Sequence, residues 1–309
     1  MSDVAVVTGG AGFIGSHIAD ALLTKGFRVV ILDNLSTGKR ENIPSGAVFY
    51  EVEVQSPEVM DIFEKEGPRW VFHLAAQIDV RKSVLDPKWD AECNIIGTIN
   101  VLEASSRVWC DKFVFTSSGG VIYGEACTPA PEDTPPSPIC PYGISKWSGE
   151  EYVKFYGRER ELSYTILRYA NVYGPRQDPK GEAGVVAIFS YQLLRGEKSV
   201  LYGFGKMVRD YVYVGDVVSA NLLAMERGDG EVINIGTGKG TTVEELFSLL
   251  ESIVGVKGRP EFAPARPGEL QSNMVDISKA KVVLGWEPEH SLEEGLRLTV
   301  DWFRKQLEG

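Results

Sequence analysis

The chain has 309 residues, of which 43% are hydrophobic and 24% are charged, a balance that is typical of globular proteins and excludes a disordered or fibrous chain. Asp and Glu outnumber Lys and Arg by 43 to 32, and the net charge of −11 argues against nucleic acid or anionic lipid as a partner. No apolar run reaches 18 residues and no basic segment precedes the first one, so we expect a cytoplasmic protein that does not enter a membrane.

Short apolar runs alternate with helical patterns through the first half of the chain. The predicted strands are residues 4–7, 29–32, 71–74, 113–115 and 164–167, and the predicted helices are residues 17–25, 57–66, 89–108 and 145–160. This alternation predicts right-handed crossovers and a parallel sheet that is covered on both faces. We therefore predict a doubly wound α/β (Rossmann) domain over residues 1–174.

The pattern changes after residue 174, where glycine and proline separate shorter elements. We predict a second, smaller α/β lobe over residues 175–309 that binds the substrate. An apolar run at residues 232–236 is a candidate for returning to the main sheet, together with the segment at about 210–240.

A glycine-rich turn follows the first predicted strand and opens a helix. Gly9 suits the tight turn, Gly12 allows the backbone to approach a pyrophosphate, and Gly15 permits close packing of helix and strand. Asp33, at the end of the second strand, is placed to bind the ribose hydroxyls of NAD and to repel the extra phosphate of NADP. We predict NAD as the cofactor, while Lys39 and Arg40 keep NADP as an alternative.

Tyr142 and Lys146 are four residues apart and share one face of a predicted helix. An ammonium group beside a phenol lowers the pKa of the phenol, so that tyrosinate can act as a base. Ser118 lies in the turn after the strand at 113–115, at the carboxyl edge of the sheet, where a hydroxyl group can orient a sugar.

The cysteines and histidines do not indicate a metal site. Cys93, Cys110, Cys127 and Cys140 are far apart, and there are only three histidines. We expect reduced, structural thiols and no bound metal.

Several motifs together resemble a known family: the glycine turn with Asp33, residues 73–76, residues 116–118, the Tyr142 and Lys146 pair, and residues 168–175. The chain resembles, nearly end to end, the extended short-chain dehydrogenase/reductases that act on nucleotide sugars. Within that family it is most similar to the NAD-dependent UDP-glucose 4-epimerases.

The resemblance implies a catalytic set of Ser118, Tyr142 and Lys146 and the interconversion of UDP-glucose and UDP-galactose. In such enzymes tyrosinate removes the proton of the 4-hydroxyl group while C4 gives its hydride to NAD. The 4-keto sugar then turns over and takes the hydride back on its other face. The serine bonds O4, and the lysine holds the nicotinamide ribose and tunes the tyrosine.

The resemblance also implies further contacts. Those to the cofactor are Phe13, Ile14, Asn34, Ser36, Thr37, Gly38, Glu53, Val54, Leu74, Ala75, Ala76, Gln77, Asn94, Ser117 and Tyr169, besides the glycines, Asp33, Tyr142 and Lys146. Those to the UDP-sugar are Asn171, Val185, Tyr202, Arg209 and Arg266, besides Ser118 and Tyr142. Many relatives carry Asp where this chain has Glu53.

Gly119 and Gly120 favour epimerisation over dehydration or decarboxylation, because related enzymes of those classes carry an acid after the serine. Asn273 aligns with a position that limits space beside the C2 substituent of the sugar. Some relatives carry a bulky tyrosine there, and the smaller Asn273 favours a UDP-N-acetylhexosamine as an alternative substrate. A UDP-uronate is a further alternative. A net dehydrogenase and a non-catalytic NAD-sensing module are further alternatives. The helices at 89–108 and 145–160 carry more apolar residues than packing on one sheet face requires, and the resemblance implies that these helices pair in a homodimer.

Overall fold

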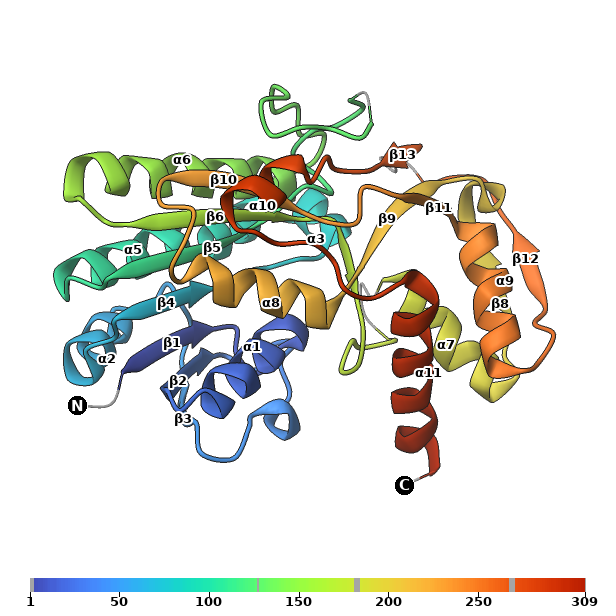
Figure 1. Ribbon diagram of the computed structural model, residues 1–309, viewed down its shortest axis with the longest axis horizontal. Coiled ribbons are helices and arrows are strands. Elements are labelled where there is room, and N and C mark those ends of the chain that lie inside the picture. The colour runs from blue at the N-terminus through green and yellow to red at the C-terminus, as the bar shows by residue number, and fades with distance from the viewer. Residues whose placement is uncertain (1–2, 127, 181–183, 267–269, 309) are drawn as a thin grey trace.

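A seven-stranded sheet forms the larger part of the protein (Figure 1). The computed structural model describes residues 3–126, 128–180, 184–266 and 270–308. The strands are β1 (Val4–Thr8), β2 (Arg28–Asp33), β3 (Val48–Glu51), β4 (Trp70–His73), β5 (Lys112–Ser118), β6 (Tyr164–Tyr169) and β10 (Glu231–Ile235). Their order in the sheet is β10, β6, β5, β4, β1, β2, β3, with all neighbours parallel. The predicted doubly wound fold is confirmed, and β10 joins the main sheet.

Helices cover both faces of this sheet. They are α1 (Phe13–Thr24), α2 (Glu58–Glu66), α3 (Val80–Leu85), α4 (Pro87–Ala91), α5 (Gly97–Arg107), α6 (Pro141–Arg160), α8 (Val214–Ala224) and α10 (Ser278–Val283). Successive strand residues point to opposite faces. In β1, Val6 therefore packs in the core with α2, α5 and α6, whereas Ala5 and Val7 pack in the core with α1 and α8. Strands buried on both faces explain the continuous apolar runs in the sequence.

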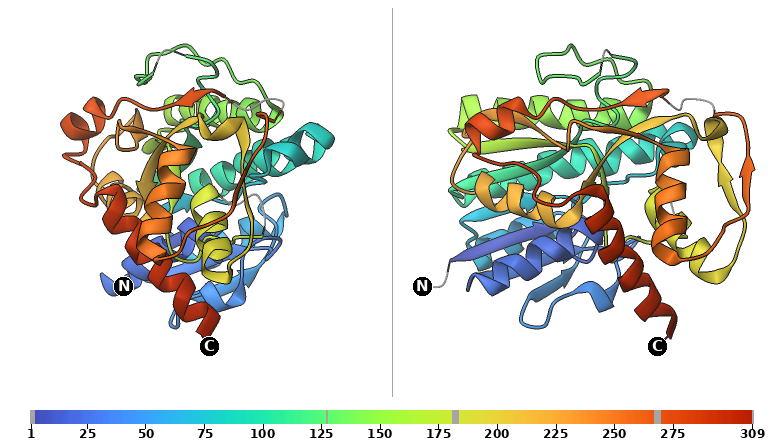
Figure 2. Two further views of the ribbon diagram at one scale, coloured as in Figure 1. Left: turned by 90° about the vertical axis from the view of Figure 1, so that its right-hand side faces the viewer. Right: turned by 45° about the vertical axis from the view of Figure 1, so that its right-hand side comes forward.

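A smaller lobe lies to the right of the sheet in Figure 1. Its strands are β7 (Asn171–Tyr173), β8 (Ser199–Leu201), β9 (Val208–Tyr213), β11 (Gly240–Thr242), β12 (Pro260–Phe262) and β13 (Ser272–Asn273), and its helices are α7 (Val185–Arg195), α9 (Val243–Val254) and α11 (Leu292–Glu308). Figure 2 shows α11 beside α7 and α9, around a core that includes Phe189, Leu246 and Leu296. Only Ala170 separates β6 from β7. A domain boundary at residue 174, with the segment at about 210–240 assigned to the first domain, stays a proposal.

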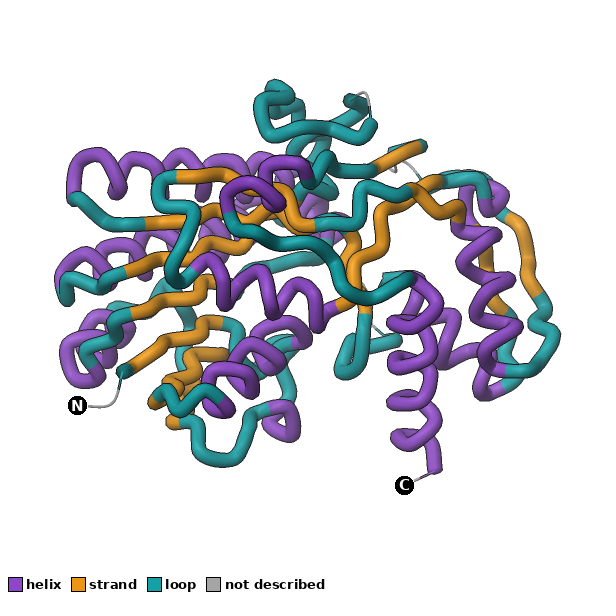
Figure 3. The backbone as a smooth tube through the Cα atoms, in the orientation of Figure 1, coloured by secondary structure: helices purple, strands orange, loops and turns teal. Residues whose placement is uncertain are grey.

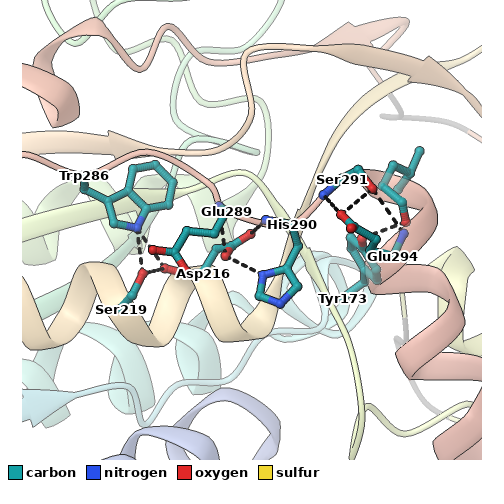
Figure 4. Close-up of polar contacts among 9 residues, drawn as sticks. Tyr173, Asp216, Ser219, Trp286, Glu289, His290, Ser291 and Glu294 are labelled. Carbon is teal, nitrogen blue, oxygen red and sulfur yellow. Dashed lines mark hydrogen bonds and ion pairs between the residues drawn. The ribbon is translucent and has the colours of Figure 1, made fainter.

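Polar contacts of Asp216 fasten the segment before α11 to α8 (Figure 4). The carboxylate of Asp216 accepts hydrogen bonds from the backbone N–H groups of Glu289 (3.2 Å) and His290 (3.3 Å), and its Oδ1 lies 2.8 Å from Nδ1 of His290. The indole N–H of Trp286 donates to the backbone oxygen of Asp216 and to Ser219. The chain is thus anchored on the large sheet's layer before it enters the smaller lobe as α11.

The structure differs from the sequence predictions in three elements. The helix predicted at 89–108 consists of α4, a π-helical turn (Glu92–Ile96) and α5. Helix α6 begins at Pro141 because proline suits the first helical turn. Strand β3 was not predicted, since its half-buried residues lie at the edge of the sheet and lack a long apolar run.

Within the described ranges, no helix is long and apolar enough to cross a bilayer, and no group of three or more His, Cys, Asp or Glu side chains is arranged to hold a metal ion. Cys93, Cys110 and Cys140 are free thiols. Cys127 lies outside the described residues.

Candidate active site

A cavity of about 760 Å³ opens at the carboxyl ends of the large sheet's strands. Figure 3 shows these ends on the side that faces the smaller lobe. The predicted cofactor residues that line it are Gly9, Gly12, Phe13, Ile14, Gly15, Asp33, Asn34, Ser36, Thr37, Val54, Leu74, Ala75, Ala76, Gln77, Ser117, Tyr142, Lys146 and Tyr169. The crevice at this edge, where the strand order reverses between β1 and β4, is the usual ligand site of open α/β sheets.

The three glycines form a cradle that side chains would fill. Gly9 has a φ of +69°, and a Cβ atom at Gly15 would lie 2.3 Å from the backbone oxygen of Gly9. Gly12 is the N-cap of α1, and no side chain of the described residues caps this helix. The free N–H groups and the dipole at the start of α1 therefore suit a phosphate.

Asp33 is buried at the end of β2 and shapes the adjoining wall. Its carboxylate accepts hydrogen bonds from the backbone N–H groups of Ala11 (3.0 Å) and Leu35 (2.8 Å). Burial raises the pKa of Asp33, and these two hydrogen bonds lower it. Gly38 does not line the cavity but packs on Asp33, because a Cβ atom there would lie 2.7 Å from Oδ1. A carboxylate at this place favours NAD over NADP.

NADP was kept as an alternative cofactor because Lys39 and Arg40 could both bind its extra phosphate. In the structure these two side chains lie in different places. Lys39 lines the cavity, whereas Arg40 pairs with Glu51 at the edge of the sheet. Of the two cations, only Lys39 is placed to bind the 2′-phosphate of NADP, so NADP is less favoured as the cofactor.

Besides Gly38, two further predicted cofactor residues are not part of the cavity lining. Glu53 is exposed and accepts a hydrogen bond from Gln55, while Val52, Val54 and Gln55 line the cavity. Asn94 is buried and holds Gln77 in place: its Oδ1 accepts from the backbone N–H of Gln77 (2.7 Å), and its Nδ2 donates to the backbone oxygen (2.9 Å). Both can therefore act only through neighbouring residues in this arrangement.

The predicted catalytic residues meet on one wall. Ser118 ends β5, Tyr142 and Lys146 lie in the first two turns of α6, and all three line the cavity. The ammonium group of Lys146 donates to the backbone oxygen of Thr116 (2.9 Å) and lies 5.3 Å from the ring centre of Phe115. A hydroxyl group, a phenol and an ammonium group thus share one wall of the cavity.

The pKa of Tyr142 corrects one sequence prediction. Burial raises this pKa, and Asp90 and Cys140 raise it further, so the protein's own groups hold Tyr142 as a phenol. The expected lowering is not found because the phenol is enclosed and faces a carboxylate. Burial lowers the pKa of Lys146 to about 8, although Asp90 and Glu150 raise it. A positive charge brought in by a ligand would favour tyrosinate.

The glycine pair after Ser118 and the predicted specificity residue lie together. Asn273 donates a hydrogen bond from Nδ2 to the backbone oxygen of Gly120 (2.5 Å). A Cβ atom at Gly120 would lie 3.3 Å from Oγ of Ser118, and one at Gly119 would lie 2.7 Å from Val275. Any side chain at these positions would crowd the serine or the wall behind it.

Apart from Ser118 and Tyr142, the predicted nucleotide-sugar residues lie in the smaller lobe, outside the lining of this cavity. Asn171 in β7 donates to the backbone oxygen of Asp210 in β9, and Arg209 pairs in register with Asn273 of β13. The guanidinium group of Arg266 stacks over the ring of Tyr202 at 3.8 Å. Val185 begins α7. Residues 267–269 of the motif that follows Arg266 lie outside the described residues.

The cavity has a basic rim that no sequence motif predicted. Arg81, Lys82, Arg176 and Lys180 line the cavity although the chain is acidic. Arg176 also pairs with Asp20 of α1 at 2.7 Å, which ties the segment after β7 to the glycine-turn helix. These residues belong to no motif, and their charge alone does not distinguish them among the 32 Lys and Arg residues of the chain.

Comparisons with known proteins agree with this geometry. The sequence model of the NAD dependent epimerase/dehydratase family matches residues 5–236. A UDP-glucose 4-epimerase from Mycolicibacterium smegmatis is 43% identical over 308 residues, covering 97% of this chain and 98% of that protein. The crystal structure of a Thermotoga maritima UDP-glucose 4-epimerase with UDP-glucose has a TM-score of 0.97 and 56% identity, covering 98% and 99% of the two chains. That of a Thermus thermophilus UDP-glucose 4-epimerase with NAD has a TM-score of 0.94 and 46% identity, covering 97% and 99%.

Proposed function

This chain belongs to the NAD dependent epimerase/dehydratase family, and from that membership we propose that it is an isomerase that interconverts UDP-glucose and UDP-galactose at C4. The family resemblance found in the sequence is thereby confirmed, and NAD is the cofactor. The observation that carries the proposal is the placement of Ser118, Tyr142 and Lys146 on one wall of the cavity that also holds the glycine turn and Asp33. This set suits reversible oxidation of a single hydroxyl group.

Each of the three residues has a distinct task. Tyr142 takes the proton of the 4-hydroxyl group and later returns it, and Ser118 bonds O4 so that the proton moves along a fixed line. Lys146 would donate to the nicotinamide ribose of bound NAD and would stabilise tyrosinate. Bound NAD supplies the acceptor, and afterwards the donor, of the hydride at C4. Arg209 and Arg266 are assigned to the diphosphate, because their guanidinium groups can donate two parallel hydrogen bonds.

The function is tested by incubating the purified protein with UDP-galactose and separating the products by chromatography while following NADH absorbance. We expect an equilibrium mixture with UDP-glucose and no accumulation of NADH. NADH that accumulates during turnover would indicate a net dehydrogenase. Bound NAD without any product from UDP-hexoses, UDP-N-acetylhexosamines or UDP-uronates would favour the NAD-sensing module.

A UDP-N-acetylhexosamine is the second candidate substrate, and Asn273 supports it. Its Oδ1 atom is buried and has no hydrogen-bond partner among the described residues. A buried acceptor of this kind gains by meeting a donor. The amide N–H of a C2 acetamido group would supply one.

Replacing Asn273 with tyrosine is expected to separate the two sugars. The larger ring fills space beside the C2 substituent, so turnover of UDP-N-acetylgalactosamine should fall at least about tenfold more than turnover of UDP-galactose. Steady-state kcat/KM for both substrates measures this ratio. Asn273→Ser, which stays small, serves as the control, and equal losses on both sugars in the tyrosine variant would remove Asn273 from the specificity site.

We also propose that the chain forms a homodimer through α4, α5 and α6. These helices and the turn between them expose a set of large apolar side chains: Trp89, Ile96, Ile144, Trp147 and Phe155. Large apolar side chains exposed on neighbouring helices are typical of an interface. Sedimentation at micromolar concentration should give twice the mass of one chain, and Trp147→Glu should shift the protein to monomer. A single species with the mass of one chain for the unaltered protein would contradict the proposal.

The cytoplasmic location stays a prediction.

A further inference from the structure

We propose that Asp90 is a positioning residue of this site, whose buried carboxylate is the counter-ion that keeps Lys146 in its ammonium form. The proposal rests on the function proposed above, in which a charged Lys146 stabilises tyrosinate. Asp90 lies near the end of α4, is only 1% exposed, and takes no direct part in the mechanism described. A buried carboxylate needs a partner to remain charged.

The hydrogen bonds of Asp90 join two walls of the cavity. Its Oδ1 atom accepts from Nε2 of Gln77 (3.1 Å) and from Nδ2 of Asn94 (3.1 Å). Nδ2 of Asn94 also lies 3.2 Å from the hydroxyl oxygen of Ser145, the residue before Lys146. The carboxylate therefore links the segment after β4 with the catalytic turns of α6.

The distribution of charge singles out Asp90. Two carboxylates act on Lys146, those of Asp90 and Glu150. Glu150 is engaged by Arg168 through two hydrogen bonds of 2.8 and 2.7 Å. The hydrogen bonds of Asp90 come from neutral groups, and no ion pair within 4 Å involves it in the described part of the chain. The carboxylate that is left to balance the charge of Lys146 is that of Asp90.

The pKa shifts agree with this pairing. Burial lowers the pKa of Lys146 to about 8, and Asp90 opposes this shift more than Glu150 does. Burial raises the pKa of Asp90, whereas hydrogen bonds from Ser145 and Gln77 and the charge of Lys146 lower it. With a pKa of about 8, Lys146 would lose its charge near neutral pH if its counter-ion were removed.

The remaining groups around Lys146 do not replace Asp90. Tyr142 is held as a phenol, and burial lowers the pKa of His73 to about 3, so its ring is neutral. The charged side chains on the neighbouring α3 and on the π-helical turn, and the thiol beside them, are exposed or only half-buried: Arg81, Lys82, Glu92 and Cys93.

Removing the charge of Asp90 should move the pH profile of the enzyme. Asp90 raises the pKa of both Lys146 and Tyr142. Without its charge both groups lose their protons at lower pH. The alkaline limb, where Lys146 becomes neutral, and the acid limb, where Tyr142 must ionise, then both shift downward. A purely structural role would lower activity at every pH and leave the profile in place.

The first test compares Asp90→Asn with Asp86→Asn. Asparagine at position 90 keeps an oxygen acceptor for Gln77 and Asn94 and removes only the charge. Asp86 is the exposed N-cap of the same helix and stays a competent cap as asparagine. We expect the kcat profile for UDP-galactose to shift downward by about one pH unit in Asp90→Asn, the low end of the range for a close charge, and not to move in Asp86→Asn. A profile that falls in height without moving overturns the proposal.

The second test needs no turnover. Acetic anhydride acetylates the neutral amine of a lysine, so the labelling of Lys146 against pH, read by mass spectrometry, reports its charge. The half-labelling pH should fall by about one unit in Asp90→Asn and stay at the unaltered value in Asp90→Glu, which retains the charge. Equal curves for the unaltered protein and Asp90→Asn overturn the proposal. If the unaltered protein shows no epimerase activity, the proposed function fails while this labelling still decides the role of Asp90.

Discussion

Tyr142→Phe is expected to reduce the epimerisation of UDP-galactose by about 10³-fold or more, because general acid–base groups contribute about 10²- to 10⁴-fold. The phenol lies on the cavity wall with Ser118 and Lys146. Phenylalanine keeps the ring that fills this wall and removes only the hydroxyl group. The expected loss is therefore in kcat, with NAD still bound.

Chromatographic assays of initial rate and a measurement of bound NAD check this prediction. Tyr152→Phe is the matched control, since Tyr152 lies in the same helix, is exposed and lies outside the cavity lining. We expect this control to keep the unaltered rate. A Tyr142→Phe variant with more than a tenth of the unaltered kcat would contradict the assignment of Tyr142 as the base.

Glu150→Gln is expected to lower the free energy of unfolding by about 3–5 kcal/mol, because it leaves a buried guanidinium group without its counter-charge. The side chains of Glu150 and Arg168 are 0% and 3% exposed. Glu150 also accepts a hydrogen bond from Ser117 (2.6 Å). Glu150 lies in α6, one turn beyond Lys146. The pair therefore supports the end of β5, which carries Ser118.

Denaturant unfolding of the variants measures this loss. Glu159→Gln is the control, because Glu159 is in the same helix and pairs with Arg158 at the surface, where such a pair contributes less than about 1 kcal/mol. Glu150→Gln combined with Arg168→Met removes both charges and should cost less than the sum of the two single changes. Strictly additive losses would show that the pairing of the charges contributes nothing.

The parts of this molecule that could be predicted from sequence are those with a local cause. Strands buried on both faces must be apolar, so the ends of β1, β2, β4, β5 and β6 were predicted to within three residues. The glycine turn was recognised because only glycine fits at these two positions. Gly9 has a positive φ, and a Cβ atom at Gly15 would lie 2.3 Å from a carbonyl oxygen.

Other features depend on contacts between distant segments. Val52, Val54 and Gln55 line the cavity, whereas the side chain of Glu53 between them is exposed and lies outside the lining. The raised pKa of Tyr142 comes from burial and from Asp90, which lies 52 positions away in the chain. Neither burial nor this neighbour could be inferred from the spacing of Tyr142 and Lys146. The basic rim of the cavity likewise comes from α3 and from the segment after β7.

The single residue between β6 and β7 has a stereochemical consequence. Tyr169, a proposed cofactor contact, and Asn171, a proposed nucleotide contact, stand on either side of Ala170, whose N–H donates to Ile235 of β10. Extended backbone rises by about 3.3 Å per residue, so their Cα atoms are about 7 Å apart. Covalent geometry fixes this span. The proposed contacts to the cofactor and to the nucleotide are therefore held next to each other where the chain passes from the large sheet to the smaller lobe.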